Sequence, residues 1–309
     1  MITSKLLNEF KLSIKSPDTE EKIDLVFYRF FGFLIAKFAH ILKMTPTQLT
    51  LLGLFSGVAS AALYLNDNFI FATFLFLLSG IFDSSDGQLA RISKQSTKLG
   101  IILDGICDSL VTIAIYAAGI YPWFQTTGWW VWPIGYLGAI LHSNQCAVLD
   151  FYHREYLYFG YGKTENDTYW NPEVDEAHKN VNNSENKKER ILNSLRVTWI
   201  KQQRMTSSRP KSWRLLMRKL IHSADSVKKE KFMQRYRELN KPMLPYWRLI
   251  GVNMHTIIII GAFYFHLFGV YIVLFDFLLF NFIIFIMRKI QYQKDRLLMQ
   301  EFFDEKSWI

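Results

Sequence analysis

Long apolar segments dominate this 309-residue sequence and limit what it can fold into. Half of its residues are apolar and 16% are aromatic. A helix of about 20 apolar residues suffices to cross a bilayer. Segments of about that length run roughly over 47–65, 68–89, 99–121, 129–150, 246–268 and 270–288. The sequence therefore predicts an all-α membrane protein with six transmembrane helices.

The positions of Lys and Arg predict how these helices are oriented. Both residue types occur in the N-terminal tail, at 91–98, throughout 154–245 and after position 288. The turns at 66–68, 121–130 and 266–269 contain neither. Because cytoplasmic loops of membrane proteins collect Lys and Arg, we expect both termini to be cytoplasmic.

A shorter apolar segment, Val26–Lys43, precedes the first span. At 100° per residue its Arg29, Lys37, His40 and Lys43 fall on one stripe of an otherwise apolar helix. That pattern is typical of an amphipathic helix that lies in the membrane interface.

These segments divide the chain into four regions: 1–45 (cytosolic tail and interfacial helix), 46–150 (spans one to four), 151–245 (a large cytosolic insertion) and 246–309 (spans five and six with a cytosolic tail). The insertion carries 20 Lys and Arg against 11 Asp and Glu, an excess equal to the net charge of +9 of the whole chain. Within it, Lys211–Ser223 predicts a basic amphipathic helix on the anionic leaflet. We expect no nucleic-acid partner, because no binding motif of interleaved aromatic and basic residues supports one.

Four aspartates stand at the ends of two predicted spans. Asp83 and Asp86 lie one helical turn apart, and Asp104 and Asp108 share a face of the next span. The basic turn at 91–98 places both pairs at the cytoplasmic ends of antiparallel helices. Carboxylates at membrane depth usually carry function, and such a set of oxygen ligands suits Mg²⁺ or Mn²⁺. Structural polar contacts or helix caps are the alternative.

Eight positions around these aspartates form a recognisable motif. Its members are Asp83, Asp86, Gly87, Ala90, Arg91, Gly100, Asp104 and Asp108. At every spacing the motif resembles the signature of the CDP-alcohol phosphotransferase family. The stretch TPTQLT at 45–50 is similar to another element of that family, although Thr47 stands where the family usually has Asn.

The resemblance implies an enzyme that displaces CMP from a CDP-linked lipid or alcohol with an acceptor hydroxyl. It implies that Asp83, Asp86, Asp104 and Asp108 hold Mg²⁺ or Mn²⁺, and that Asp108 is the general base. It further implies a homodimer in contact with membrane lipids, with the active site facing the cytoplasm. The residues implied to contact CDP are Thr45, Thr50, Asp83, Gly87, Ala90, Arg91 and Gly100.

The acceptor alcohol is less defined by the sequence. Polar residues follow the fourth span toward its cytoplasmic end, and the candidates for acceptor contacts are His142, Asn144, Asp150 and Arg154. A phosphate could bind at Arg154, which favours inositol phosphate or inositol. Serine, glycerol phosphate, and transfer from a CDP-aminoalcohol to diacylglycerol or ceramide stay open. For each residue alone, a hydrogen bond between helices is the alternative.

Two other classes of membrane protein also use intramembrane carboxylates. A cation channel or transporter would not need Gly87, Ala90 and Arg91 in the motif. An intramembrane prenyltransferase binds diphosphate through paired aspartate motifs but has no fixed Ala-Arg pair. Release of CMP rather than pyrophosphate distinguishes the predicted enzyme from the prenyltransferase.

Overall fold

A computed structural model describes residues 8–11, 13–14, 18–95, 97–163, 190, 191, 194, 197, 209–222 and 225–304. All regular secondary structure in these residues is helical, which confirms the predicted all-α class. Much of the predicted insertion, including the stretch 164–189, lies outside the described residues.

The chain forms two compact units, which are described separately. Unit 1 comprises Met1–Ser143 and His255–Phe277, and unit 2 comprises Asn144–Met254 and Leu278–Ile309. The helices up to residue 161 are η1 (Asp24–Tyr28), α2 (Arg29–Ile41), α3 (Pro46–Leu65), α4 (Phe69–Ser93), α5 (Lys98–Thr127) and α6 (Val131–Tyr161). The later helices are α9 (Lys211–Ile221), α10 (Ser226–Asn240), η3 (Lys241–Met243), α11 (Leu244–Trp247), η4 (Arg248–Ile250), α12 (Val252–Tyr264), α13 (Phe268–Val270), η5 (Tyr271–Leu279) and α14 (Phe280–Phe302).

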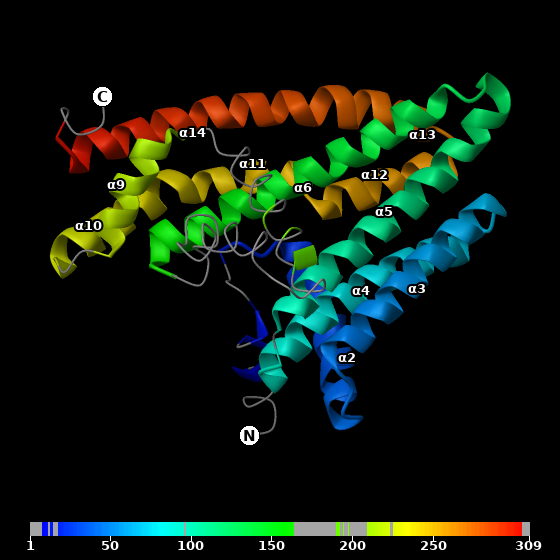
Figure 1. The fold of residues 1–309 in the computed structure, drawn as a ribbon, viewed down its shortest axis with the longest axis horizontal. Helices are drawn as coiled ribbons and strands as arrows, with labels where there is room; N and C mark the ends of the chain where they lie inside the picture. Colours follow the sequence, from blue (N-terminus) through cyan, green and yellow to red (C-terminus); the bar gives the residue numbers. More distant parts are fainter. Residues whose placement is uncertain are drawn as a thin grey trace. The chain divides into compact units, whose positions relative to one another are not determined.

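In unit 1, α3 packs side by side with α4 and α5 (Figure 1). Small residues make this close packing possible, as is common between membrane helices. A Cβ added at Gly57 of α3 would lie 2.6 Å from the Val111 side chain of α5. Ser79 of α4 donates a hydrogen bond to the backbone oxygen of Gly53 at 2.8 Å. These contacts bring the two aspartate-bearing helices, α4 and α5, against the same helix.

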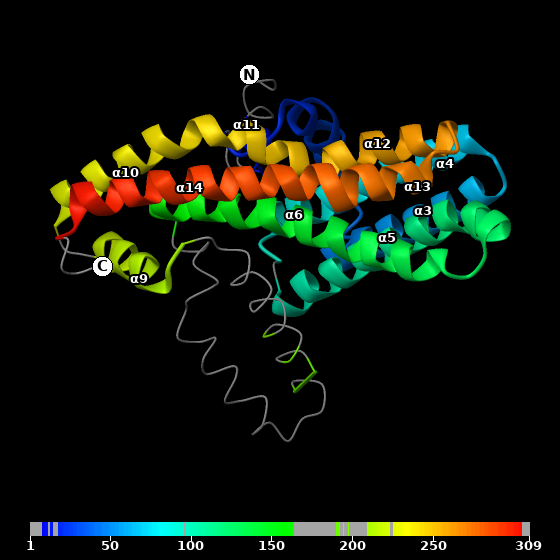
Figure 2. The same ribbon diagram turned by 90° about the horizontal axis from the view of Figure 1, so that it is seen from above.

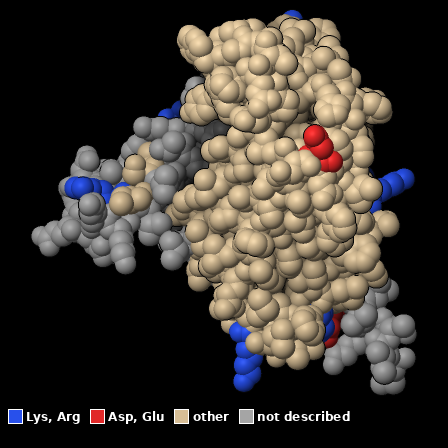
Figure 3. All heavy atoms as spheres, turned by 90° about the vertical axis from the view of Figure 1, so that its right-hand side faces the viewer, with Lys and Arg blue, Asp and Glu red and all other residues tan. Residues whose placement is uncertain are grey.

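The outer surface of unit 1 is strongly apolar. Phe55, Ile70 and Phe265 are each about three-quarters exposed, at 74%, 74% and 75%. Charged side chains are sparse on the face of the molecule shown in Figure 3. An exposed apolar surface of this extent is what a lipid-facing protein requires.

Five helical segments among the described residues are long and apolar enough to cross a membrane: Pro46–Leu65, Phe69–Ser93, Ile102–Thr127, Ser226–Tyr264 and Phe268–Phe302. This supports an integral membrane protein, but the predicted count of six is not confirmed. The fourth predicted span corresponds to α6, which is helical and long, yet is not among the five. Its polar run from His142 to Gln145 interrupts the apolar character of the helix.

The predicted interfacial segment forms η1 and α2, and α2 packs against α4. Its predicted polar stripe is partly engaged in ion pairs: Arg29 pairs with Glu20 at 2.9 Å and Lys37 with Glu9 at 2.6 Å. Small residues of α2, such as Gly32 and Ala36, are buried. Phe33 is buried as well, but most of the other bulky apolar residues of α2, such as Phe38 and Ile41, are exposed, as an amphipathic helix in contact with lipid requires.

Unit 2 has its own apolar core, to which α9 contributes. Trp213, Met217 and Leu220 of α9 are buried with residues of α6, α10 and α14. Helices α10 and α14 run alongside one another (Figure 2). The predicted amphipathic helix is thus present, but the prediction that its apolar face lies on the leaflet is wrong. Protein covers that face.

A cluster of buried charged side chains also holds unit 2 together. The Arg209 guanidinium donates two hydrogen bonds to the Asp295 carboxylate, both at 2.9 Å, and one to Glu155 at 2.5 Å. Arg214 forms a second ion pair with Glu155. Burial by itself lowers the pKa of Arg209, but the Asp295 and Glu155 carboxylates outweigh this and raise it well above its usual value. Arg209 therefore stays charged.

Candidate active site

The four aspartates of the motif line one pocket of unit 1. Helix α4 contributes Asp83 and Asp86, and α5 contributes Asp104 and Asp108. Carboxylate oxygens of Asp83, Asp104 and Asp108 all lie within 4.8 Å of one another. The spacing within each helix puts each pair on one face, and the packing of both helices on α3 brings the pairs together.

Asp86 has a different environment from the other three aspartates. Its residue is only 6% exposed, whereas Asp83 and Asp108 are exposed and Asp104 is half-buried. The hydroxyl of Thr50, on α3, donates a hydrogen bond of 2.6 Å to Asp86 Oδ2. Thr50 itself is buried, so this hydrogen bond fixes the Asp86 side chain against α3.

The remaining wall of the pocket is small and mostly apolar. It consists of Thr50, Gly53, Leu54, Ser79, Cys107 and Val111. A Cβ added at Gly53 would lie 3.4 Å from the Ser79 backbone oxygen. The glycine therefore allows α3 to approach α4 closely beside the carboxylates.

Two of the residues expected to contact CDP, Thr45 and Gly100, take part in helix capping. Thr45 caps the start of α3: its side chain accepts from the Gln48 amide, and the Gln48 side chain accepts from the Thr45 amide at 2.8 Å. The Gly100 amide donates to the Thr97 side chain at 3.0 Å, which caps α5. These caps fix where the two helices start. CDP contacts by these residues stay predictions.

Arg91, Gly87 and Ala90 continue α4 past the aspartates. The Arg91 Nε donates to the backbone oxygen of Ser13 at 2.6 Å. A Cβ added at Gly87 would lie 3.5 Å from the Arg91 guanidinium. One edge of the Arg91 guanidinium is therefore occupied by the N-terminal segment, while the side chain passes beside the open face of Gly87.

The residues predicted to contact the acceptor are divided between the two units. Asp150 and Arg154 form an ion pair of 2.8 Å within α6, where they belong to unit 2. Asn144 also belongs to unit 2. His142 belongs to unit 1 but is not among the residues that line the aspartate pocket. The acceptor contacts therefore stay a prediction.

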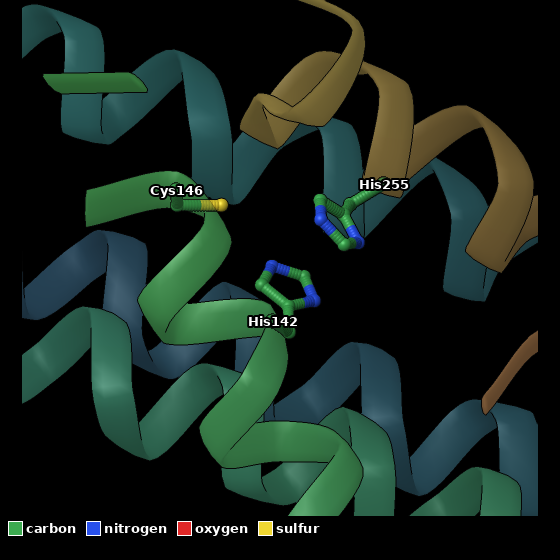
Figure 4. Close-up of side chains that lie close together, drawn as sticks. All are labelled: His142, Cys146 and His255. Atoms are coloured by element: carbon green, nitrogen blue, oxygen red, sulfur yellow. The ribbon is translucent and has the colours of Figure 1, made fainter. Parts of the chain in front are cut away.

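His142 instead belongs to a buried hydrogen-bond network. Its imidazole stacks on that of His255 at 3.9 Å between ring centroids (Figure 4). The Nδ1 atoms of both rings lie within hydrogen-bonding distance of the Tyr271 hydroxyl, at 3.2 and 2.7 Å. Tyr116 donates a 2.6 Å hydrogen bond to Asp276 and contacts Tyr271 at 3.0 Å. This corresponds to the alternative of hydrogen bonds between helices.

Tyr116, Tyr271 and Asp276 are polar partners that were not predicted from the sequence. A signal was present for Asp276, because an ionisable residue inside an apolar span usually has a partner there. Asp276 lies in η5, a stretch of π-helix, which is rare in proteins and favours functional or strained positions. The figure also labels Cys146, one helical turn after His142 on α6 (Figure 4).

The aspartate pocket fits a divalent metal ion. Mg²⁺ binds oxygen ligands at about 2.0–2.1 Å, so ligands on opposite sides of the ion are about 4 Å apart. One carboxylate oxygen from each of Asp83, Asp104 and Asp108 lies within 4.8 Å of the other two, which is compatible with ligation of one ion. Three convergent carboxylates without a cation would repel one another.

Comparison with known proteins supports the resemblance seen in the motif. Residues 43–149 match the CDP-alcohol phosphatidyltransferase family. The matched region contains α3, α4 and α5 and all four aspartates. The family predicted from the motif is therefore confirmed for this part of the chain.

Individual relatives also match only a part of this chain. A phosphatidylinositol phosphate synthase of Corynebacterium glutamicum is 41% identical over 86 residues, which is 27% of this chain and 39% of that protein. A CDP-diacylglycerol--glycerol-3-phosphate 3-phosphatidyltransferase of Cereibacter sphaeroides is 40% identical over 87 residues, 25% of this chain and 39% of that protein. A bifunctional IPC transferase and DIPP synthase of Thermococcus kodakarensis is 33% identical over 102 residues, 33% of this chain and 23% of that protein.

The chain thus spans less than half the length of the curated relatives it matches. No solved structure matches it. The comparisons establish the family of the aspartate-bearing region.

Proposed function

We propose that this protein is a metal-dependent CDP-alcohol phosphotransferase of membrane-lipid synthesis. The observation that carries the proposal is the convergence of Asp83, Asp104 and Asp108 in one pocket, with Asp86 fixed in the same pocket by Thr50. The family match of residues 43–149 supports it independently. A channel or transporter would not need this family's motif.

Asp83, Asp86, Asp104 and Asp108 would hold Mg²⁺ or Mn²⁺. When bound, the ion neutralises charge on the donor diphosphate and on the CMP that leaves. The chain's own contribution is to fix the four carboxylates on two helices that both pack on α3, so that the reacting groups are held in position.

Asp108 takes the proton from the acceptor hydroxyl. The hydroxyl oxygen then bonds to the phosphorus that carries the donor's alcohol or lipid group. The bond from that phosphorus to the bridging oxygen breaks, and CMP leaves with this oxygen. Asp108 is suited to this role because it is more exposed than Asp104, so that an acceptor can reach it.

For the acceptor we favour inositol phosphate or inositol, used with a CDP-lipid donor. Two relatives support this preference, the phosphatidylinositol phosphate synthase of Corynebacterium glutamicum and a CDP-diacylglycerol--inositol 3-phosphatidyltransferase of Drosophila melanogaster, which is 32% identical over 68 residues. Transfer from a CDP-aminoalcohol to diacylglycerol or ceramide is the second candidate. The ion pair of Arg154 with Asp150 weakens the argument that Arg154 binds the acceptor phosphate.

The experiment uses the purified full-length protein in lipid nanodiscs with CDP-diacylglycerol. Inositol phosphate, inositol, glycerol phosphate and serine are supplied in parallel, and released CMP and pyrophosphate are measured. We expect CMP only with Mg²⁺ or Mn²⁺, fastest with an inositol compound, and none after chelation by EDTA. Release of pyrophosphate with a prenyl diphosphate, and no CMP with any CDP donor, would contradict the proposal.

We also propose that the pocket faces the cytoplasm, that both termini are cytoplasmic, and that the protein is a homodimer. The distribution of Lys and Arg supports the orientation. Labelling of single cysteines in intact cells tests it, since positions 94 and 300 should be protected and positions 67 and 126 accessible from outside. Cross-linking in the membrane tests the dimer.

A further inference from the structure

Hydrogen bonds attach α2 to α4 directly behind the aspartate motif. The Arg29 Nη1 donates to Ser84 Oγ at 3.2 Å, and the Gln88 Nε2 donates to the Arg29 backbone oxygen at 3.0 Å. The Arg29 Nε also donates to Glu20 Oε2 at 2.9 Å. Ser84, Gln88 and Glu20 are all buried. One arginine therefore joins the N-terminal segment, α2 and α4.

The residues that hold α2 lie on α4 opposite the catalytic ones. Ser84 and Gln88 alternate in sequence with Asp83 and Asp86. At 3.6 residues per turn, the midpoint of the first pair lies about 150° around the helix from the midpoint of the second. A rotation of α4 about its axis would therefore break the contacts with Arg29 and turn the carboxylates out of the pocket together.

Two close backbone approaches fix the distance between the helices over the same stretch. A Cβ added at Gly32 would lie 2.9 Å from Ser84 Oγ. A Cβ added at Gly80 would lie 2.8 Å from the ring of Tyr28. The two glycines allow contacts at Gly80 and Ser84 of α4, on either side of Asp83.

The front face of the same turn is held by α3. Thr50 donates to Asp86, and Ser79 donates to the Gly53 backbone oxygen. With Arg29 behind and Thr50 in front, α4 is fixed from both sides. Such support matters because displacement of a catalytic group by about 1 Å can cost about 100-fold in rate.

We propose that Arg29 is a positioning residue for the metal-binding aspartates, acting through Ser84 and Gln88. The inference rests on the proposed function and extends it to α2, which lies outside the family-matched residues 43–149. Arg29 sets the rotation of α4, and with it the distances from Asp83 and Asp86 to Asp104 and Asp108.

The chain provides a matched control on the same helix. Lys37 also lies on α2 and pairs with an acid of the N-terminal segment, Glu9, at 2.6 Å. Among the residues that the structure describes, no hydrogen bond of the Lys37 side chain to α4 is found. Arg29→Gln and Lys37→Gln thus each remove one ion pair and one positive charge, but only Arg29→Gln removes the contact with Ser84.

The experiment measures Mn²⁺ binding by the full-length protein in nanodiscs, through loss of the electron paramagnetic resonance signal of free Mn²⁺. We expect Arg29→Gln to weaken Mn²⁺ binding about tenfold and to lower kcat about 10- to 100-fold, with a smaller change in KM for the CDP donor. Lys37→Gln should stay within twofold of wild type in both measurements. Wild-type Mn²⁺ affinity in a folded Arg29→Gln protein would overturn the proposal.

Milder variants decide the question if Arg29→Gln does not fold. Ser84→Ala should weaken Mn²⁺ binding in the same direction, and Arg29→Lys should restore part of the loss because it keeps the charge beside Glu20. Ser84→Ala with unchanged Mn²⁺ affinity would contradict the proposal. Mn²⁺ binding without CMP release in the wild type would refute the proposed function only, whereas a wild type that binds no Mn²⁺ would refute both.

Discussion

Two clusters of acidic side chains in this molecule are built in opposite ways. In unit 2, Glu155 and Asp295 are almost completely buried, and Arg209 binds both. In unit 1, Asp83, Asp104 and Asp108 converge to within 4.8 Å of one another and line a pocket. The first cluster carries its own cation, whereas the second offers three carboxylates to a cation from solution. The first cluster is thus neutralised within the protein, whereas the second matches the metal binding that we propose.

The cost of burial explains this difference. A buried carboxylate is tolerated when a fixed, hydrogen-bonded cation accompanies it. Arg209 supplies that cation to carboxylates 54 and 86 positions away in the sequence. The pocket of unit 1 instead leaves Asp83 and Asp108 exposed, as the proposed binding of a metal and a diphosphate would require. Acidic composition alone does not distinguish the two kinds of cluster.

Removal of one carboxylate from each cluster tests this difference most directly. Asp108→Asn removes the proposed base and should lower kcat for CMP release by about 100- to 10,000-fold, with nucleotide binding largely preserved. Asp295→Asn should instead lower thermal stability, with the rate per folded molecule little changed. The measurements are CMP release, binding of a CDP analogue and thermal unfolding. Normal turnover by Asp108→Asn would show that another group accepts the proton.

Removal of the buried cation is expected to have the next largest effect. Arg209→Met leaves Glu155 and Asp295 buried without their shared guanidinium, and should destabilise the fold by about 3–5 kcal/mol. The matched control is Arg235→Met, whose ion pair with Glu301 is exposed and should matter little. Thermal unfolding in the same detergent compares the two variants. Equal stability of both variants would mean that the buried cluster does not hold unit 2 together.

The aspartate pocket could be predicted largely from the sequence. Asp83 with Asp86 and Asp104 with Asp108 lie close together within helices, and helical periodicity fixes their relative directions. The bounds of α3 and α4 also agree with the predicted spans to within four residues, and α5 starts within one residue of its predicted span but ends six residues later; long apolar runs are strong signals. The part of the site that depends on local sequence could therefore be predicted.

The contacts of distant residues could not be predicted in the same way. Nothing in the sequence around Arg209 indicates Glu155 or Asp295 as its partners. The amphipathic pattern of 211–223 correctly predicts a helix with one apolar face, but the pattern is the same whether lipid or protein covers that face. The partners of His142 could not be predicted for the same reason, because Tyr116 and Tyr271 come from other helices.

A smaller effect is expected where the pocket is held by a single neutral hydrogen bond. Thr50→Val keeps the shape of the side chain but leaves Asp86 without the 2.6 Å hydrogen bond from the hydroxyl. A loss of about 1–2 kcal/mol in this interaction corresponds to roughly a 10-fold weaker Mn²⁺ affinity. Thr50→Ser retains the hydroxyl and serves as the control. Equal Mn²⁺ affinities of the two variants would show that Thr50 acts only through packing.

The smallest effect is expected on the exposed side of α9. The sequence predicted that the basic residues of this helix face an anionic leaflet, but Arg214 is buried in an ion pair with Glu155, while Lys219 is exposed. Lys219→Gln should therefore change thermal stability very little and KM for a CDP-lipid by less than twofold, since one surface charge is largely screened by salt. Arg214→Gln, which removes the same charge from the same helix, should lower the unfolding temperature clearly because Glu155 loses a buried partner. Both variants are compared by thermal unfolding and by CMP release at low and high salt. A strong rise in KM for Lys219→Gln that disappears at high salt would restore the leaflet as a partner of α9, and would show that unit 2 contributes to substrate binding as well as to stability.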